Sequence, residues 1–363
     1  MNSFKLIFVT VLLAFVANVQ EAEAQDPRFS QFYASPLQLN PAMTGVFQGR
    51  WRVNANYRDQ WSEVLGDVPF RTLAASFDAR YKVTRNDYFG FGVNVMHDEV
   101  GEGRFQTNRA SLNLSFIKQL TGGGYSRGAE SYLVAGAQGG VGQHSADWNQ
   151  FWFTNQFDNG TRTPNTSLGN GETSIGDDTG NSEIYADFNA GLMYYALFDN
   201  DATIYVGLAG NHLNQPNVSL IEGGSESLYT RWVVHAGGEI PLGVNTGLSL
   251  MPAAVFMLQG EHMSTSVGAN FRYTNHDWQE VAIRAGVWPH LVRRENGLED
   301  TKLSMDAIAV AFILEMNRFN VGLSYDVTTS NLAVANNSRG AFELSMIYVH
   351  PAYERVKTKC PKF

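Results

Sequence analysis

Apolar and polar residues alternate with a period of two along most of the chain beyond residue 50. This alternation predicts β-strands with one apolar and one polar face, because successive side chains of a strand point to opposite sides of the sheet. The segment 263–273 is the clearest example, with Val267 and Phe271 on one face and Asn270 and Arg272 on the other. We find about fourteen such segments, at 50–58, 71–82, 87–96, 105–119, 130–145, 183–197, 202–212, 229–241, 247–258, 263–273, 280–290, 302–315, 319–327 and 340–349.

The predicted strands are long, and the links between them alternate in length. Strands of soluble proteins average about five or six residues, whereas about ten tilted residues span a bilayer. Short links alternate with long ones such as 146–182, and only the link near 259–261 breaks the rule. Brief periplasmic turns and long outer loops are typical of outer-membrane barrels. The pattern therefore predicts an all-β fold, a transmembrane antiparallel β-barrel of about 14 strands over residues 50–350, with extracellular loops and both termini in the periplasm.

The polar faces are predicted to line the lumen, and the apolar faces to contact lipid. An arginine that faces the middle of the bilayer costs roughly 2 to 4 kcal/mol, so we assign the charged residues to the interior. The inward set is Arg52, Arg58, Asp78, Arg80, Arg109, Asp187, Glu239, Arg272, Arg284, Asp306, Asp326 and Glu343. Aromatic residues near strand ends suit the two interfacial girdles; they are Tyr57, Trp61, Tyr88, Phe89, Trp232, Tyr273, Trp278, Trp288 and Tyr348.

Residues 1–24 have the features of a secretory signal peptide. Lys5 precedes an apolar run at 6–17, and Ala22-Glu23-Ala24 is a small-x-small cleavage site. The apolar run is too short to cross a bilayer as a helix. We therefore exclude residues 1–24 from the fold.

The segment 25–49 is predicted to be a short plug or cap packed against the barrel. Its prolines, at positions 27, 36 and 41, prevent a long helix and remove backbone donors that a strand would use. Phe29 and Phe32 nevertheless need to be covered from water. A compact, irregular segment that packs against a larger body satisfies both conditions.

Residues 351–363 are expected to form a periplasmic tail, which contains the only cysteine, Cys360. A single cysteine cannot form an intramolecular disulfide. The neighbouring lysines favour a thiolate, but no histidine lies nearby in sequence to act as a base. Two readings stay open for Cys360: an intermolecular contact or disulfide, and no role beyond recognition of the chain terminus.

Composition fits an exported barrel and argues against binding of nucleic acid. The formal net charge is −9 at pH 7, charged residues make up only 17% of the chain, and aromatic residues make up 12%. An acidic chain of this kind is a poor nucleic-acid binder. A large secreted β-protein has a similar composition, so this argument supports the strand pattern without replacing it.

Little in the sequence points to chemistry. The eight histidines are scattered, without metal-ligand spacing. Asp177, Asp178 and Asn181 belong to an acidic, oxygen-rich loop, but the loop departs from the calcium-loop pattern, which favours a solvated surface loop. The chain contains no G-x-S-x-G and no H-E-x-x-H motif. We expect no enzyme and no cofactor, although a catalytic cluster at the rim of a barrel would leave no local motif.

Both ends of the mature chain carry motifs that resemble the PorP/SprF family of outer-membrane proteins from type IX secretion and gliding systems. The motifs at the front are Asp26-Pro27, Phe29-Ser30-Gln31, Pro36-Leu37, Leu39-Asn40-Pro41-Ala42, Gly45 and Asn56-Tyr57-Arg58-Asp59-Gln60-Trp61. Those at the back are Gly322-Leu323-Ser324-Tyr325-Asp326, Arg339-Gly340-Ala341-Phe342-Glu343 and Cys360-Pro361-Lys362-Phe363.

This resemblance implies a non-enzymatic outer-membrane barrel that helps to export or anchor a secreted surface protein. The implied partners are an adhesin with a type-B-like C-terminal sorting domain, ring or other periplasmic components of the secretion system, and outer-membrane lipid. We expect the outer contact in 146–182, which includes Asp177, Asp178 and Asn181. The inner contact is expected in the plug and the tail, at Phe29, Phe32, Asn40, Pro41, Lys359, Cys360 and Phe363.

A diffusion or uptake channel for small hydrophobic molecules is the alternative. Asn40-Pro41-Ala42 also resembles the N-terminal plug of FadL-type fatty-acid transporters. A transporter predicts a continuous lumen and a defined apolar pocket. An anchor predicts a plugged lumen and an outer surface large enough to hold a protein.

Overall fold

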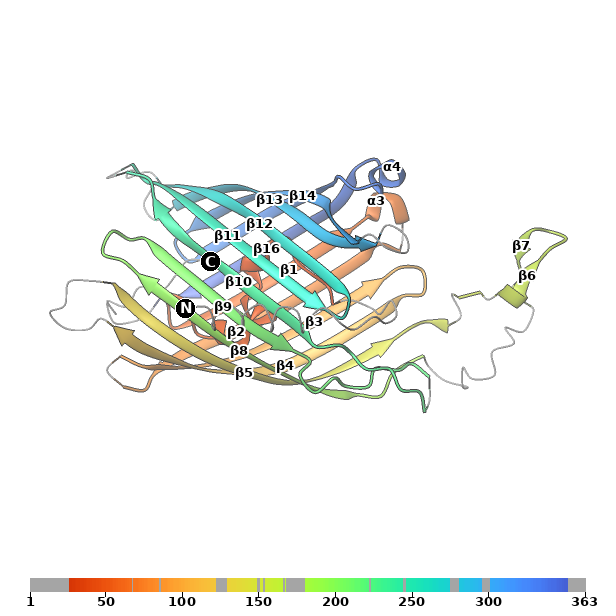
Figure 1. Ribbon diagram of the computed structural model, residues 1–363, viewed down its shortest axis with the longest axis horizontal. Helices are drawn as coiled ribbons and strands as arrows, with labels where there is room; N and C mark the ends of the chain where they lie inside the picture. The colour runs from red at the N-terminus through yellow and green to blue at the C-terminus, as the bar shows by residue number, and fades with distance from the viewer. Residues whose placement is uncertain are drawn as a thin grey trace, which may run out of the picture.

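Fourteen strands of the described chain close into one antiparallel barrel (Figure 1). The computed structural model describes residues 26–351, except 67, 85, 122–128, 149–150, 153, 166, 168–179, 222, 244–245, 275–280 and 296–300. The barrel strands are β1 (Trp51–Gln60), β2 (Phe70–Lys82), β3 (Tyr88–Val100), β4 (Phe105–Thr121), β5 (Glu130–Ser145), β8 (Tyr185–Leu197), β9 (Thr203–Asn211), β10 (Arg231–Pro241), β11 (Leu248–Gln259), β12 (His262–Thr274), β13 (Val281–Glu295), β14 (Thr301–Met316), β15 (Phe319–Thr328) and β16 (Arg339–His350).

Each strand pairs with its neighbours in chain order, and β1 pairs with β16 to close the barrel, with Trp51 opposite His350. The predicted fold class, an all-β antiparallel barrel of 14 strands, is confirmed. No helix in the described residues is long and apolar enough to cross a membrane.

The two faces of the wall are divided largely as the alternation predicts. Most charged residues of the inward set are buried, among them Asp78 and Glu343 at 0% exposure, and Arg109, Arg272 and Asp306 are partly buried. Apolar side chains such as Leu112 and Phe312 are exposed on the outer face, which suits contact with lipid. The girdle prediction is wrong for Tyr88 and Trp288, which are buried inside the barrel because their positions on β3 and β13 share the phase of the inward residues. Trp278 lies outside the described residues.

The two ends of the barrel differ. We call the end with the β5–β8, β9–β10 and β15–β16 links the loop end, and the opposite end the turn end. The loop end also carries α3 (Ser62–Leu65), η4 (Thr154–Gln156) and α4 (Ala333–Asn336). Within the β5–β8 link, β6 (Phe157–Asp158) and β7 (Thr163–Pro164) form a small hairpin that lies away from the barrel (Figure 1).

Residues 26–50, which we call the plug, run through the lumen before β1 begins. The plug contains η1 (Phe32–Ala34), α2 (Pro36–Leu39) and η2 (Pro41–Met43). Each of the last two begins with proline, whose fixed φ suits the first helical position. Asp26 contacts Arg109 near the start of β4, at the loop end, whereas the amide of Arg50 donates to the carbonyl of His350 at the turn end.

The plug runs through the lumen from the loop end to the turn end before it reaches β1. Strands β1 and β16 do have their outer ends at the turn end, as an even strand count requires. The chain ahead of β1, however, turns back through the lumen, so Asp26 lies at the loop end. Residue 25, where the mature chain is expected to begin, lies outside the described residues, so the prediction that both termini lie in the periplasm stays a prediction.

Candidate functional site

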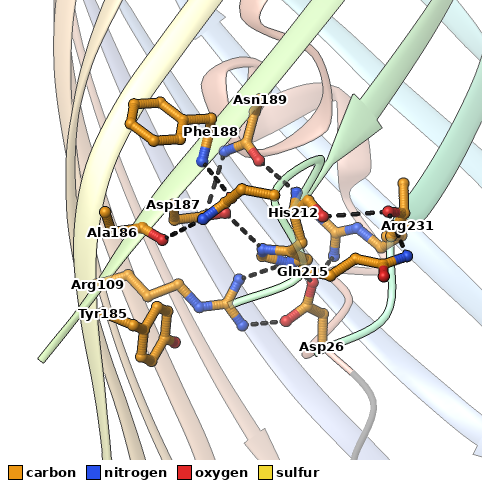
Figure 2. A network of polar contacts seen from close by, with 12 residues as sticks. Asp26, Arg109, Tyr185, Ala186, Asp187, Phe188, Asn189, His212, Gln215 and Arg231 are labelled. Atoms are coloured by element: carbon orange, nitrogen blue, oxygen red, sulfur yellow. Dashed lines mark hydrogen bonds and ion pairs between the residues drawn. The ribbon is translucent and has the colours of Figure 1, made fainter. Parts of the chain in front are cut away.

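The candidate site is the plugged lumen, and its loop end is closed by a cluster of buried charges around Asp26 (Figure 2). One oxygen of this carboxylate pairs with Arg109 of β4. The other lies 2.7 Å from Nε2 of His212 and 3.1 Å from Nη1 of Arg231. The backbone amide of Asp26 donates to Gln259 of β11. We call Asp26 and its wall partners the latch.

His212 links the plug to a second carboxylate in the wall. Its Nδ1 lies 2.8 Å from Oδ1 of Asp187 on β8, while its Nε2 faces Asp26. Only the imidazolium form has two N–H donors, and it therefore satisfies both carboxylates. His212 follows directly after β9, and its amide donates to the side chain of Asn189, which fixes the ring in place.

The charges of the latch shift the pKa values of its groups in opposite directions. Burial alone raises the pKa of Asp26, but Arg109, His212 and Arg231 outweigh it and hold the pKa well below its usual value. Burial lowers the pKa of His212, but the charge of Asp26 and hydrogen bonds to Asp187 and Asp26 outweigh it, so the pKa is raised. Both groups are therefore held in their charged forms.

A second group of polar contacts holds the next turn of the plug. The amides of Ser30 and Gln31 donate to the carboxylate of Glu343 at 2.7 and 3.0 Å. Arg58 of β1 bridges Glu343 and Asp326 through both of its terminal nitrogens. The plug thus supplies backbone donors to a carboxylate that is fully buried from solvent.

Arg28 of the plug pairs with Asp306 at 2.9 Å, and a β-bulge makes this contact available. His290 pairs with Ala307 and Leu291 pairs with Met305, which leaves Asp306 as the extra residue of β14. A bulge of this kind re-aims a side chain at the rim of a barrel.

Asn40, Pro41 and Ala42 sit in a notch that glycines of the wall leave open. The side-chain amide of Asn40 donates to the carbonyls of Leu192 and Leu208 at 3.2 and 3.3 Å and lies 3.0 Å from His235. A Cβ atom at Gly136 would collide with the backbone of Pro41 and Ala42, and one at Gly191 would collide with the side chain of Asn40. We call this notch, which also includes Gly207 and Gly90, the glycine seat.

Replacing Asn40 by alanine is expected to lower the free energy of unfolding by about 2 to 4 kcal/mol, because buried carbonyls lose their donor and η2 loses its cap. Urea unfolding of the protein in lipid vesicles would measure this. Gln38→Ala is the matched control, since its side chain in α2 makes no described hydrogen bond. Equal stability of the two variants would contradict the assignment of Asn40 as an anchor.

Apolar contacts fill the middle of the lumen around Trp288. The ring of Phe32 packs edge-on against Trp288 with centroids 5.4 Å apart, and the ring of Tyr33 lies 5.6 Å from it. All three side chains are buried. The inward position of Trp288 is therefore explained by its packing against the plug.

Above the plug, at the loop end, lies a cavity of about 510 Å³ that we call the cup. Its floor is formed by Asp26, Pro27 and Arg28. Its wall carries charged and aromatic side chains together; they include Arg58, Trp61, Phe70, Asp98, Phe105, Arg109, His144, His262, Arg293 and Asp306. The cup is thus a polar and aromatic hollow that ends on the plug.

The residues predicted from sequence to contact partners lie in different parts of the structure. Phe29, Phe32, Asn40 and Pro41 are buried inside the barrel, where they bind the wall. Asn181 pairs with Ser145 at the base of the long loop. Asp177, Asp178, Lys359, Cys360 and Phe363 lie outside the described residues. The partner contacts predicted for all of these residues stay predictions.

Reasoning from sequence missed His212 and Asp26 as a pair, and it missed the glycine seat. His212 was one of eight scattered histidines, and only its position at the end of the predicted strand 202–212 was a signal. Within the described residues, no group of three or more His, Cys, Asp or Glu side chains is arranged to hold a metal ion. The contacts described above hold the plug by charge pairs and close packing.

Several solved barrels are similar to this chain, but only weakly. The TodX monoaromatic hydrocarbon channel deltaS2 mutant has a TM-score of 0.48 at 11% identity, over 88% of this chain and 94% of that one. CdiB from Acinetobacter baumannii has a TM-score of 0.44 at 8% identity, over 82% and 60%. The CymD monoaromatic hydrocarbon channel has a TM-score of 0.41 at 12% identity, over 88% and 94%. We draw no argument from likeness at this level.

The sequence itself is more informative about family. No curated protein matches the chain. The model of one protein family, described as type IX secretion system membrane protein PorP/SprF, matches residues 21–348. Since this match covers nearly all of a chain that folds as a closed barrel, the protein belongs to the PorP/SprF family of type IX secretion system membrane proteins.

Proposed function

We propose that this outer-membrane barrel is a non-enzymatic partner of a secreted surface protein, which it helps to export or to hold at the cell surface. The observation that carries the proposal is the plug, which fills the lumen of a type IX secretion barrel from the loop end to the turn end. A lumen occupied by its own chain leaves the loop end as the surface where another protein is held.

The cup supports this reading over uptake of small hydrophobic molecules. Its floor is closed by the plug, and its lining carries Arg28, Arg109, Asp98 and Asp306 instead of being continuously apolar. An apolar ligand would bury these charged groups further without offering them a hydrogen bond. A protein surface with its own polar groups satisfies them.

The partner we propose is an adhesin with a type-B-like C-terminal sorting domain, which contacts the extracellular loop end. The long loop, with Asp177, Asp178 and Asn181, is the proposed outer contact. Ring or other periplasmic components of the secretion system are the proposed inner partners, reached by Lys359, Cys360 and Phe363. Phe29, Phe32, Asn40 and Pro41 take part in such a contact only if the plug leaves the lumen, because the wall now covers them.

Affinity purification of the tagged barrel from its native membrane in mild detergent tests the proposal. We expect a large surface adhesin and ring components to co-purify, as identified by mass spectrometry. Recovery of the barrel alone, together with ion conductance of the same sample in planar bilayers, would instead favour a channel.

Deleting residues 158–180 is expected to release the adhesin from the cell surface without loss of the barrel. The deleted segment contains the β7 strand but no barrel strand, so the ladder from β5 to β8 is kept. Surface labelling of the adhesin measures the loss. The gel shift of the unheated barrel serves as the control for folding. Unchanged surface display of the adhesin would show that this loop is not the outer contact.

A further inference from the structure

The wall of the cup is apolar at its rim and polar near its floor. Phe105 and Arg109 occupy positions of the same phase on β4, and both line the cup. Phe105 begins the strand at the loop end, so Arg109 lies about 13 Å deeper along the strand, at roughly 3.3 Å per residue. On β3, Val100 at the end of the strand likewise lies above Asp98. A ligand that fits this wall has an apolar part near the rim and a polar part that reaches the floor.

Two aromatic pairs form part of the rim. The rings of Trp61 and Phe70 lie 5.1 Å apart, and those of Phe105 and His144 lie 5.3 Å apart. Trp61, Phe70 and Phe105 are only partly buried, and all of them line the cup. An aromatic side chain that enters the cup can therefore pack against these rings in offset or edge-on contact.

The floor contains an arginine whose carboxylate-binding edge is half used. Elsewhere in the lumen, Arg52 holds both oxygens of Asp78 through Nε and Nη2, at 2.9 Å each. Arg109 reaches Asp26 through Nη2 (Figure 2). Its Nε, on the same edge of the guanidinium, is buried and has no hydrogen-bond partner in the part of the chain that the structure describes. A carboxylate that is free of the plug backbone can bind both nitrogens, which is the paired geometry that a guanidinium offers.

The other charges of the floor do not select an anion. Asp306 pairs with Arg28 at 2.9 Å, and Asp98 accepts a hydrogen bond from Thr72 at 2.6 Å. The charge of Asp98 opposes an anion on the floor, so net charge is not what favours a carboxylate. Recognition rests instead on the open donor of Arg109, which already binds one carboxylate in this structure.

The plug makes the cup a blind hollow, which favours a chain end over a passing segment. Asp26, Pro27 and Arg28 close the floor. The volume of about 510 Å³ lies within the range of roughly 300 to 1,000 Å³ that is common for sites enclosing small ligands. A chain end needs no way out of the hollow, and it carries its carboxylate directly beyond its last side chain. Capture of a C-terminal carboxylate is a recurring mode of peptide recognition.

We propose that the cup binds the free C-terminal end of a partner protein, with an aromatic last side chain against the rim pairs and the terminal carboxylate on Arg109. Because Asp26 uses the same arginine, the bound carboxylate competes with the latch and loosens the loop end of the plug. The inference rests on the proposed function only in taking a secreted protein as the source of the chain end.

Fluorescent peptides test the site on the purified full-length barrel in detergent. The first peptide is Gly-Ser-Gly-Ser-Phe with a free carboxylate, and the second is the same peptide with a C-terminal amide. The third has the amide and an Asp in place of its last Ser, which moves the carboxylate to a side chain. Fluorescence anisotropy should show that the second and third peptides bind about tenfold more weakly than the first, because they lose a charge-assisted hydrogen bond at the chain end. Equal binding of the second peptide would overturn carboxylate recognition, and equal binding of the third would overturn the assignment to a chain end.

The Asp26→Asn variant provides a gain of binding that loss of folding cannot imitate. Without the competing carboxylate, Arg109 is available to the ligand, so the variant should bind the first peptide about tenfold more tightly than the parent barrel does. Binding of the amidated second peptide should change little. Asp158→Asn is the control and should bind the first peptide as the parent does. Unchanged affinity of Asp26→Asn for the first peptide would show that ligand and plug do not share Arg109, and it would overturn the proposal.

Hydrogen exchange of residues 26–34 reports the competition directly. Saturating amounts of the first peptide should accelerate this exchange in the parent barrel, whereas the amidated second peptide should not. Exchange that stays unchanged with the first peptide bound would contradict the loosening of the plug. Failure of the peptides to bind would leave co-purification of a surface adhesin unaffected, so this proposal and the proposed function fail separately.

Discussion

The Gly136→Val variant is expected to expel the plug from its seat and to open the barrel to ions. Gly136 faces the lumen on β5, and a Cβ there would collide with backbone atoms of Pro41 and Ala42, which cannot rotate away as a side-chain end can. Overpacking of this kind costs typically about 1 to 3 kcal/mol, and more where backbone must shift. We expect the plug to leave the lumen, since the barrel strands pair with one another around the whole closed ladder and the plug is not part of it.

Single-channel recording in planar bilayers measures the opening, and limited proteolysis of residues 26–50 reports the freed plug. The matched control is Gly139→Val on the same strand. Gly139 faces outward, and a Cβ there meets only the ring of Phe188 at an ordinary distance of 3.7 Å. We expect this control to stay closed. A closed, protease-resistant Gly136→Val barrel would show that the seat tolerates a side chain and does not fix the plug.

The Asp26→Asn variant is expected to release the loop end of the plug. Asparagine keeps the shape of the side chain but leaves Arg109, Arg231 and His212 around a neutral group. Removing one partner from a buried charge cluster costs about 3 to 5 kcal/mol, because the remaining charges lose their compensation. Hydrogen exchange of residues 26–34, compared with the barrel strands, measures this loss locally. Asp158→Asn in the outlying hairpin is the control, since among the described residues its carboxylate accepts hydrogen bonds only from Gly160 and Thr161 of its own turn.

The latch also predicts that the stability of the plug in the lumen depends on pH. The Asp26→Asn variant should lose this dependence. The raised pKa of His212 gives stabilisation that is complete below its unfolded value near 6.5 and is lost as pH rises through the folded pKa. The lowered pKa of Asp26 gives stabilisation that is present above 3.8 and is lost as pH falls through the folded pKa. Arg109 of β4, Asp187 of β8 and Arg231 of β10 are the charged wall groups that face Asp26 and His212.

The hydrogen-exchange rate of residues 26–34, corrected for its intrinsic pH dependence, should therefore be lowest in mildly acidic buffer and should rise above neutral pH. The Asp26→Asn variant should exchange fast throughout, without this dependence. A parent protein whose plug exchanges at a constant intrinsic-corrected rate from about pH 5 to about pH 9 would contradict the role of His212.

The barrel could be predicted from sequence because its signal is local. Each strand buries one face and exposes the other to lipid, so adjacent residues alternate with a period of two. All fourteen predicted segments are strands in the structure. The inward position of Arg58, Asp78 and Glu343 follows from the same phase and the cost of a charge in lipid. Trp288 was assigned to the girdle from its residue type, although its phase on the strand pointed inward.

The plug shows the limit of such reasoning. Its prolines and aromatic residues indicate a compact, covered segment, but they do not give its direction through the lumen. That direction is set by contacts between residues far apart in sequence: Asp26 with Arg109, 83 positions away, and Ser30 with Glu343, 313 positions away. The glycine seat likewise exists only where Gly136 and Gly191, from two different strands, meet Asn40 and Pro41. Pairing of this range depends on the closed barrel bringing the strands together, and no periodicity along the chain records which wall position faces which plug residue.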